Sequence, residues 1–229
     1  MSESENISSL IIKRTITRGI VLLVLSLVLI VSLFPPVEAI DYLFYVLTAG
    51  FNVAPEVFLM VIDVLLLLAG YWLASAVYSF LYVGKRKSNT LAFVASQLSS
   101  LNRTYNRRGL VSLTIAAAII IICHVPAILD ATLLSFELHL IMHTLMLLSG
   151  FMIFTGFRML SPNMRLLTYL LGCKGMAIFG ALLIVSPAVV YGSYPYYEQA
   201  ETGAAMIAMC IASDATVIPI WLRRYFTKR

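Results

Sequence analysis

Long apolar runs separated by short polar segments divide the chain into candidate membrane spans. An apolar run of about 20 residues is long enough to cross a bilayer as an α-helix. We expect six spans, at residues 19–34, 57–83, 109–129, 138–157, 166–190 and 201–222. The pattern therefore predicts an all-α polytopic transmembrane helical bundle, with residues 1–229 forming a single integral membrane domain.

The first apolar run, 19–34, has two interpretations. It follows a polar tail that carries Lys13, Arg14 and Arg18, and a stretch ending at Ala39 offers a small-residue cleavage site. This arrangement is typical of a cleaved secretory signal, but it also fits a retained first span. We favour the retained span.

A different periodicity marks residues 88–108, between the second and third spans. Leu91, Val94, Ala95 and Leu98 recur at helical spacing within a largely polar segment. Such spacing is typical of a short amphipathic helix that lies in the plane of a membrane surface.

Composition agrees with a membrane protein. The chain is 61% hydrophobic and 12% charged, with a mean hydropathy of +0.94, whereas a soluble domain has about 25% charged residues. The net charge of +5 does not indicate nucleic-acid binding, because no soluble basic domain is present to carry it. Cys123, Cys173 and Cys210 lie in separate apolar runs, which argues against a disulfide framework or a zinc finger.

The distribution of charge predicts the topology. Of the 16 Lys and Arg residues, 15 lie in the N-terminal tail, the 85–108 loop, the 158–165 turn and the C-terminal tail. The alternate loops, at 35–56, 130–137 and 191–201, contain none of them and carry seven acids. By the positive-inside rule, both termini are expected in the cytoplasm, and the protein in the cell membrane.

All three histidines fall in one short stretch near the predicted outer face. His124 ends the third span, and His139 and His143 are four residues apart in the fourth, where Met142 and Met146 share their face. Imidazole suits copper or zinc, and thioether favours cuprous copper. The alternative is that the histidines bond to carbonyl groups or water and the methionines only pack.

Acidic residues near the same face are further candidates. Glu198 and Glu201 open the sixth span, where they would assist a metal or simply favour the helix dipole. Asp63, nearer the outer face in the second span, would extend the histidine cluster. Deeper in the membrane, Lys174 and Asp214 each lie roughly 12 Å from the cytoplasmic side, so we expect them to form a structural ion pair.

No catalytic motif is recognisable. His139 and His143 have the two-histidine spacing of a zinc protease, but Leu140 stands where its glutamate base would be. We therefore predict no enzymatic activity.

Two sequence blocks resemble the CtaG family, the membrane assembly factors for cytochrome c oxidase. The first is His124-Val125-Pro126 with Asp130 downstream and His139 in the next span. The second opens the last span with Glu198 and Gln199 and includes Glu201, Gly203 and Met206. Together they cover about 109–222; Glu198 stands where the family has aspartate, and the paired histidines of an earlier family span have no counterpart in 1–108.

The resemblance implies a role in supplying or inserting copper as a haem-copper oxidase matures, with oxidase subunits as partners. His124, His139 and His143 would bind the metal, assisted by Glu198, Glu201 and Met142 or Met146. Two alternatives stay open: an accessory subunit of a respiratory or copper membrane complex, and a protein that binds haem b between His124 and His139 or His143. A transporter role rests only on the charges within the spans.

Overall fold

A computed structural model of the chain describes residues 3–33, 55–86, 88–192 and 195–227. Over these residues it is all-helical, without strands, which confirms the predicted fold class. The helices are α1 (Glu3–Leu33), α3 (Pro55–Gly84), α4 (Asn89–Tyr105), α5 (Leu110–Cys123), α6 (Pro126–Leu134), α7 (Phe136–Met159), α8 (Pro162–Val185) and α9 (Tyr196–Phe226). A 3₁₀ turn at Arg107–Gly109 joins α4 to α5.

Five of these helices are long and apolar enough to cross a membrane, and α5 with α6 supplies a sixth crossing if the bent pair counts as one span. The chain is therefore a multi-pass membrane protein. Helix α1 begins at Glu3, so most of the polar segment that precedes the predicted first span is helical as well. The predicted loop 35–56 lies mainly outside the described residues.

The predicted continuous span 109–129 is broken in the structure. Helices α5 and α6 meet at a bend of 69°, and α6 continues into the region predicted as an outer loop, 130–137. The cause is Pro126, since proline disfavours the helical conformation of the residue before it. Val125 is accordingly extended, with φ −62° and ψ 129°, and Pro126 opens α6, where its missing N–H costs nothing. The bend places His124 at a helix end, at the start of the corner.

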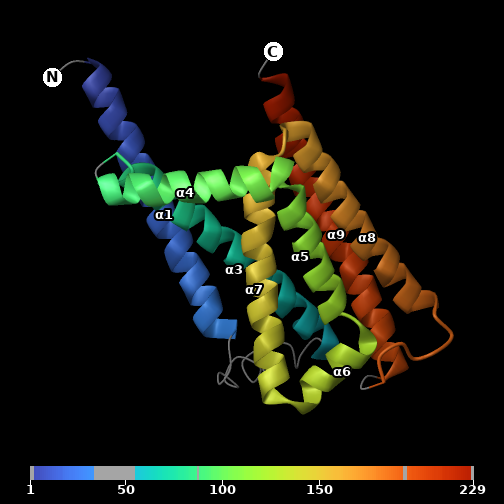
Figure 1. Cartoon of the computed structure of the whole chain (residues 1–229). Coiled ribbons are helices and arrows are strands. Elements are labelled where there is room, and N and C mark those ends of the chain that lie inside the picture. The colour runs from blue at the N-terminus through green and yellow to red at the C-terminus, as the bar shows by residue number, and fades with distance from the viewer. Residues whose placement is uncertain (1–2, 34–54, 87, 193–194, 228–229) are drawn as a thin grey trace.

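Figure 1 shows how the helices are arranged. Helix α3 packs against α1 and α7, and α5 packs against α7; we call these four helices the body. Helices α8 and α9 pack mainly on each other and form a hairpin at the edge of the body, which α9 contacts through α3. Both termini lie at one end of the bundle, crossed by α4, and α6 lies at the other end (Figure 1).

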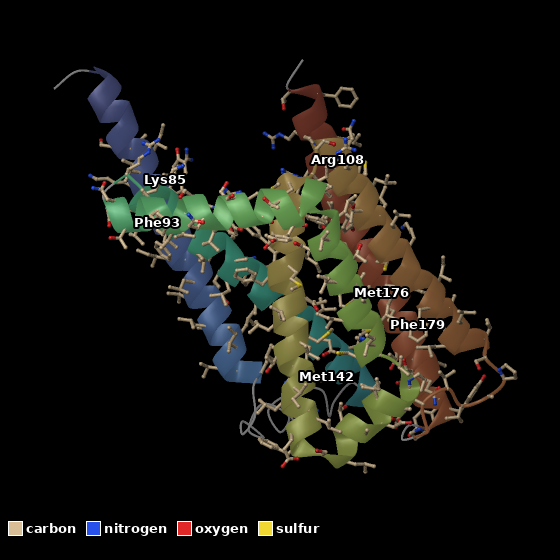
Figure 2. All side chains as sticks on the ribbon, viewed as in Figure 1. Lys85, Phe93, Arg108, Met142, Met176 and Phe179 are labelled. Atoms are coloured by element: carbon tan, nitrogen blue, oxygen red, sulfur yellow. The ribbon has the colours of Figure 1, made fainter. Side chains whose placement is uncertain are left out.

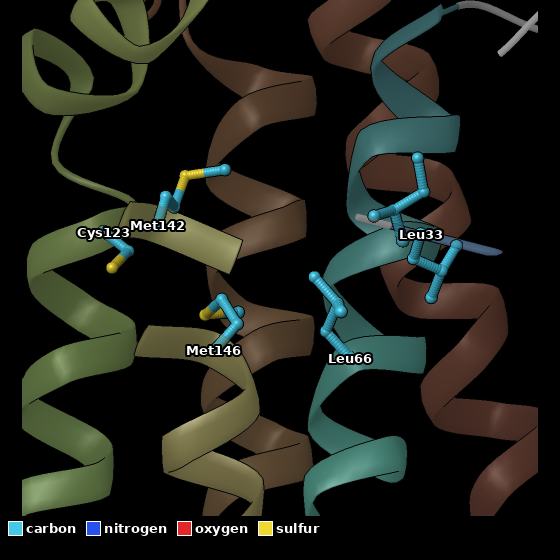
Figure 3. Close-up of a cluster of buried hydrophobic side chains, with 6 residues drawn as sticks. Leu33, Leu66, Cys123, Met142 and Met146 are labelled. Atoms are coloured by element: carbon cyan, nitrogen blue, oxygen red, sulfur yellow. The ribbon is translucent and has the colours of Figure 1, made fainter. Parts of the chain in front are cut away.

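The core of the body gathers side chains from all four of its helices. Figure 3 shows this buried cluster, which comprises Leu33, Ile62, Leu66, Cys123, Met142 and Met146. Helices in lipid associate through close packing, because lipid is as apolar as their side chains. Glycines allow that packing here: a Cβ at Gly70 would overlap the carbonyl oxygen of Leu147, and one at Gly150 would overlap that of Leu67. The backbones of α3 and α7 are thus in direct contact.

The predicted amphipathic helix is present as α4. Ser88 caps it by accepting a hydrogen bond from the backbone N–H of Leu91, and the Phe93 side chain is exposed. In Figure 2, Lys85, Phe93 and Arg108 lie at the end of the bundle that carries the termini, and Met142 lies toward the opposite end. This arrangement suits a helix lying along a membrane surface beside basic residues.

Candidate functional site

The candidate site lies at the end of the bundle opposite the termini, where α5 ends and α7 begins (Figure 1). We call this region the histidine end and define it by Asp63, His124, His139, His143 and Tyr191. Its residues come from α3, the α5–α6 corner, α7 and the loop between α8 and α9. Because of the bend before Pro126, the chain turns here and α5 ends.

Asp63 and His124 form the first pair of this site. Their Oδ2 and Nε2 atoms lie 3.4 Å apart, and the Asp63 side chain is only 7% exposed. The opposite ring nitrogen of His124, Nδ1, donates to the carbonyl oxygen of Ile120 at 2.7 Å, since a carbonyl can only accept. Nε2 therefore faces the carboxylate, and Oδ1 of Asp63 has no hydrogen-bond partner among the described residues. The pair can share a proton or a cation.

His139 and His143 form the second pair. They lie on successive turns of α7, with ring centroids 4.2 Å apart and ring planes inclined by 55°. His143 is 2% exposed, whereas His139 is half-buried, so the pair leads from the surface of the bundle into its interior. The charge of Asp63 also acts on His143. Asp63 therefore couples the two pairs electrostatically.

The two methionines predicted as soft ligands lie in the core of the body. Met142 is 4% exposed and Met146 is 1% exposed, and both belong to the buried cluster that includes Cys123 (Figure 3). Met142 precedes His143 directly in α7, and Met146 lies one turn farther along the helix. Packing accounts for Met146.

The loop between α8 and α9 closes over the α5–α6 corner. Tyr191 donates its hydroxyl hydrogen to the carbonyl oxygen of His124 at 2.9 Å, and the N–H of Gly192 donates to Oδ2 of Asp130 at 3.1 Å. Burial, with a smaller contribution from the charge of Asp130, raises the pKa of Tyr191 to about 12. The sequence alone did not point to Tyr191, because it is 67 residues from its partner.

Of the residues in the Glu198–Glu201 block, Gln199 is the one directed at this loop. Its Oε1 accepts from the N–H groups of Val190 and Tyr191 at 2.8 and 3.4 Å, and its Nε2 donates to the carbonyl oxygen of Tyr191 at 3.1 Å. Glu198 accepts from the hydroxyl of Tyr197, and Glu201 is exposed. Gln199 thus fixes the loop that bonds to His124.

Across the described part of the chain, no group of three or more His, Cys, Asp or Glu side chains is arranged to hold a metal ion. The structure divides the predicted ligands instead. It brings together two pairs, Asp63 with His124 and His139 with His143. Each pair offers two donor groups.

The predicted ion pair between Lys174 and Asp214 is formed, away from the histidine end, where it joins α8 to α9. Asp214 also accepts from the hydroxyl of Tyr169 at 3.1 Å. Cys173 and Cys210, which lie in separate apolar runs, face each other across the same contact, and the Cys210 thiol donates to the carbonyl oxygen of Cys173 at 2.9 Å. Sequence spacing could not reveal that contact.

Comparison with known families adds to this geometry. The family model described as cytochrome c oxidase caa3 assembly factor (Caa3_CtaG) matches residues 86–227. The matched region begins upstream of the expected 109 and takes in α4, the broken α5–α6 segment, α7 and the hairpin. No curated protein and no solved structure matches the chain.

Proposed function

The chain belongs to the cytochrome c oxidase caa3 assembly factor family, and from this membership we propose that it carries copper to a haem-copper terminal oxidase during assembly. The family identifies a multi-pass membrane protein of oxidase assembly. The observation that carries the copper proposal is the pair of adjacent imidazoles, His139 and His143, that runs from the surface into the bundle. Copper is the cargo in this scheme.

The chemistry of the second pair suits cuprous copper. Imidazole nitrogens bind copper well, and two histidines four residues apart on a helix reach one ion from the same face. The thioether of Met142, the residue before His143, is a soft donor of the kind that favours the cuprous state. Because His139 is half-buried and His143 is buried, an ion would bind His139 first and then reach His143.

The first pair has the features of a second two-ligand position. A metal-binding histidine usually donates its other ring N–H to a carbonyl or carboxylate, as Nδ1 of His124 does to Ile120. Two ligand atoms about 2.1 Å from a tetrahedral ion lie roughly 3.4 Å apart, and Nε2 of His124 and Oδ2 of Asp63 are separated by 3.4 Å. The carboxylate would also neutralise the charge of the ion.

Two incomplete positions suit delivery better than storage. An ion held by two protein ligands keeps coordination sites open, so a client can add its own ligands before the carrier releases the ion. The positive-inside asymmetry supports a histidine end on the non-cytoplasmic side, from which the copper centre of the oxidase would be loaded. The role is metal transfer without turnover of a substrate.

Copper content of the purified full chain tests this proposal. We expect about one cuprous ion per wild-type chain and its loss in the His139→Ala/His143→Ala variant, because two of its ligands are removed. Asp63→Asn should also weaken copper binding, because the first pair loses the carboxylate that would neutralise the charge of the ion. The control is Thr144→Ala, at an exposed position on α7. Equal copper content in the wild type and the double histidine variant would overturn the proposal.

The same preparation separates the two alternatives. A stoichiometric partner that stays bound through purification would identify an accessory subunit instead of a transient carrier. A Soret band lost in His124→Ala would identify a haem protein. Each result would count against copper transfer.

A further inference from the structure

The ion pair of the hairpin lies on the outside of the structure. The side chain of Lys174 is 55% exposed, and that of Asp214 is 18% exposed. Lys174 is twelve residues into α8 (Pro162–Val185), roughly 18 Å along the helix axis and close to its midpoint. A lysine side chain at that depth is too short to reach either membrane surface. Ionisable groups in membrane spans almost always face the bundle interior or a water-filled cavity, so this exposure is unusual.

The surface around Lys174 is otherwise apolar and open. Residues three or four apart share one face of a helix, and on α8 this face carries Leu167, Leu171, Lys174, Ile178 and Leu182, all exposed. We call it the Lys174 face. Helix α8 packs mainly on α9, and among the described residues no other helix makes a comparable contact with it. One glycine adjoins the face, Gly175, which lies four residues after Leu171, and an added Cβ there would have no atom within 4 Å.

We propose that the Lys174 face binds a second copy of this chain in a two-fold symmetric dimer, in which the two Lys174–Asp214 pairs meet within the membrane. The two charges of the Lys174–Asp214 pair favour a second copy of the chain as the partner. The pair is neutral as a whole but presents an ammonium beside a carboxylate, and a two-fold axis sets the ammonium of one copy against the carboxylate of the other. Each charge then gains a second opposite neighbour and loses its exposure to lipid.

Other occupants fit these charges less well. A partner helix with a single acid or base would leave one charge in surplus at the membrane centre, which is costly. The second copy adds one lysine and one aspartate, so no surplus arises. The open position at Gly175 allows the two α8 backbones to approach closely, as small residues do at helix interfaces in membranes.

Cysteine cross-linking of the full chain in its native membrane tests the dimer. Leu171→Cys and Gly175→Cys place thiols on or beside the Lys174 face, because Leu171 is 67% exposed and an added Cβ at Gly175 has no atom within 4 Å. We expect oxidation to give covalent dimers of twice the chain mass with both variants. The controls are the unmodified chain and Ile141→Cys, at an exposed position on α7. Cross-links to a different protein, or none above the control level, would overturn the proposal.

A second pair of variants separates loss of association from loss of folding. The Cβ of Gly175→Leu would have no atom of the chain within 4 Å, so its thermal unfolding in detergent should match the wild type, while dimer formation in vesicles of neutral lipid falls about tenfold or more. Lys174→Asp should also abolish the dimer, by setting like charges together, and adding Asp214→Lys should restore it. Energy transfer between labelled copies measures the association. Wild-type chains that stay monomeric in the vesicles, or an unchanged dimer in Gly175→Leu, would contradict the proposed interface.

Discussion

The body and the hairpin each hold an acid–base pair between two helices, but the surroundings of the two pairs differ. In the body, the side chain of Asp63 is 7% exposed and His124 lies at the end of a broken helix. On the hairpin, Lys174 is 55% exposed at the middle of a continuous helix. The first pair is enclosed and close to a surface, so it can exchange a proton or an ion. The second is remote from water, so it requires a neighbour.

Glycines show the same contrast in the packing of helices. In the body, Gly70 and Gly150 lie against the carbonyl groups of the opposite helix, so α3 and α7 are held at a fixed distance. On the hairpin, Gly172 and Gly175 face open space. Small residues in one region therefore serve contacts within the chain. Those in the other are available for contacts outside it.

Paired alanine substitutions at these glycines test the contrast in helix packing. Gly150→Ala should destabilise the protein by about 1–3 kcal/mol or more, because its methyl group overlaps the carbonyl oxygen of Leu67. Gly172→Ala should leave the free energy of unfolding unchanged or raise it by up to about 1 kcal/mol, through better helix propensity. Thermal unfolding of both variants in the same detergent measures the two changes in stability. Equal losses in the two would remove the distinction between the regions.

The next effect concerns the enclosed acid. His124→Ala leaves the carboxylate of Asp63 buried without its imidazole partner, and breaking such a buried pair costs about 3–5 kcal/mol. Adding Asp63→Asn should recover part of that loss, because the uncompensated charge disappears. Lys174→Ala should cost less when the chain is monomeric in detergent, since its side chain is mostly exposed there. Denaturant unfolding of the wild type and these three variants makes the comparison, and a double variant less stable than His124→Ala would argue against a charge-based role.

The smallest effect should appear at alkaline pH. The folded pKa of Tyr191, about 12, lies above its unfolded value of about 10. The free energy of unfolding therefore keeps its full Tyr191 contribution below pH 10 and loses it between pH 10 and 12, by about 2–3 kcal/mol. Tyr191→Phe should flatten the profile in that range, relative to a Tyr196→Phe control at an exposed site. Identical profiles for the two variants would mean that the loop does not close on His124 in solution.

Hydropathy was sufficient to predict the helical class and the approximate positions of the spans, because burial in lipid requires long apolar helices. It did not predict the break at His124, since an average over a window of residues does not register one proline. Pro126 was nevertheless visible in the sequence, and its effect on Val125 supplies the signal that the span prediction lacked. The start of α1 at Glu3 was missed for a related reason, because polar residues without a helix breaker can continue a helix beyond the membrane.

The candidate site was only partly accessible from the sequence. Helical periodicity was enough to place His139 beside His143. Periodicity could not show that Met146 packs in the core and is not a ligand. It also could not pair Asp63 with His124. Both facts depend on which helices are neighbours. The metal itself and the client stay predictions that copper analysis and purification can test.

The distance along the chain between Lys174 and Asp214 has a consequence for biosynthesis. The two residues are 40 positions apart, so α8 leaves the ribosome with a charged midpoint before its counter-ion has been translated. Lateral release of α8 alone into the bilayer would strand that ammonium in hydrocarbon. Retention of α8 at the insertion machinery until α9 emerges would let the two helices enter the lipid together, as one neutral unit.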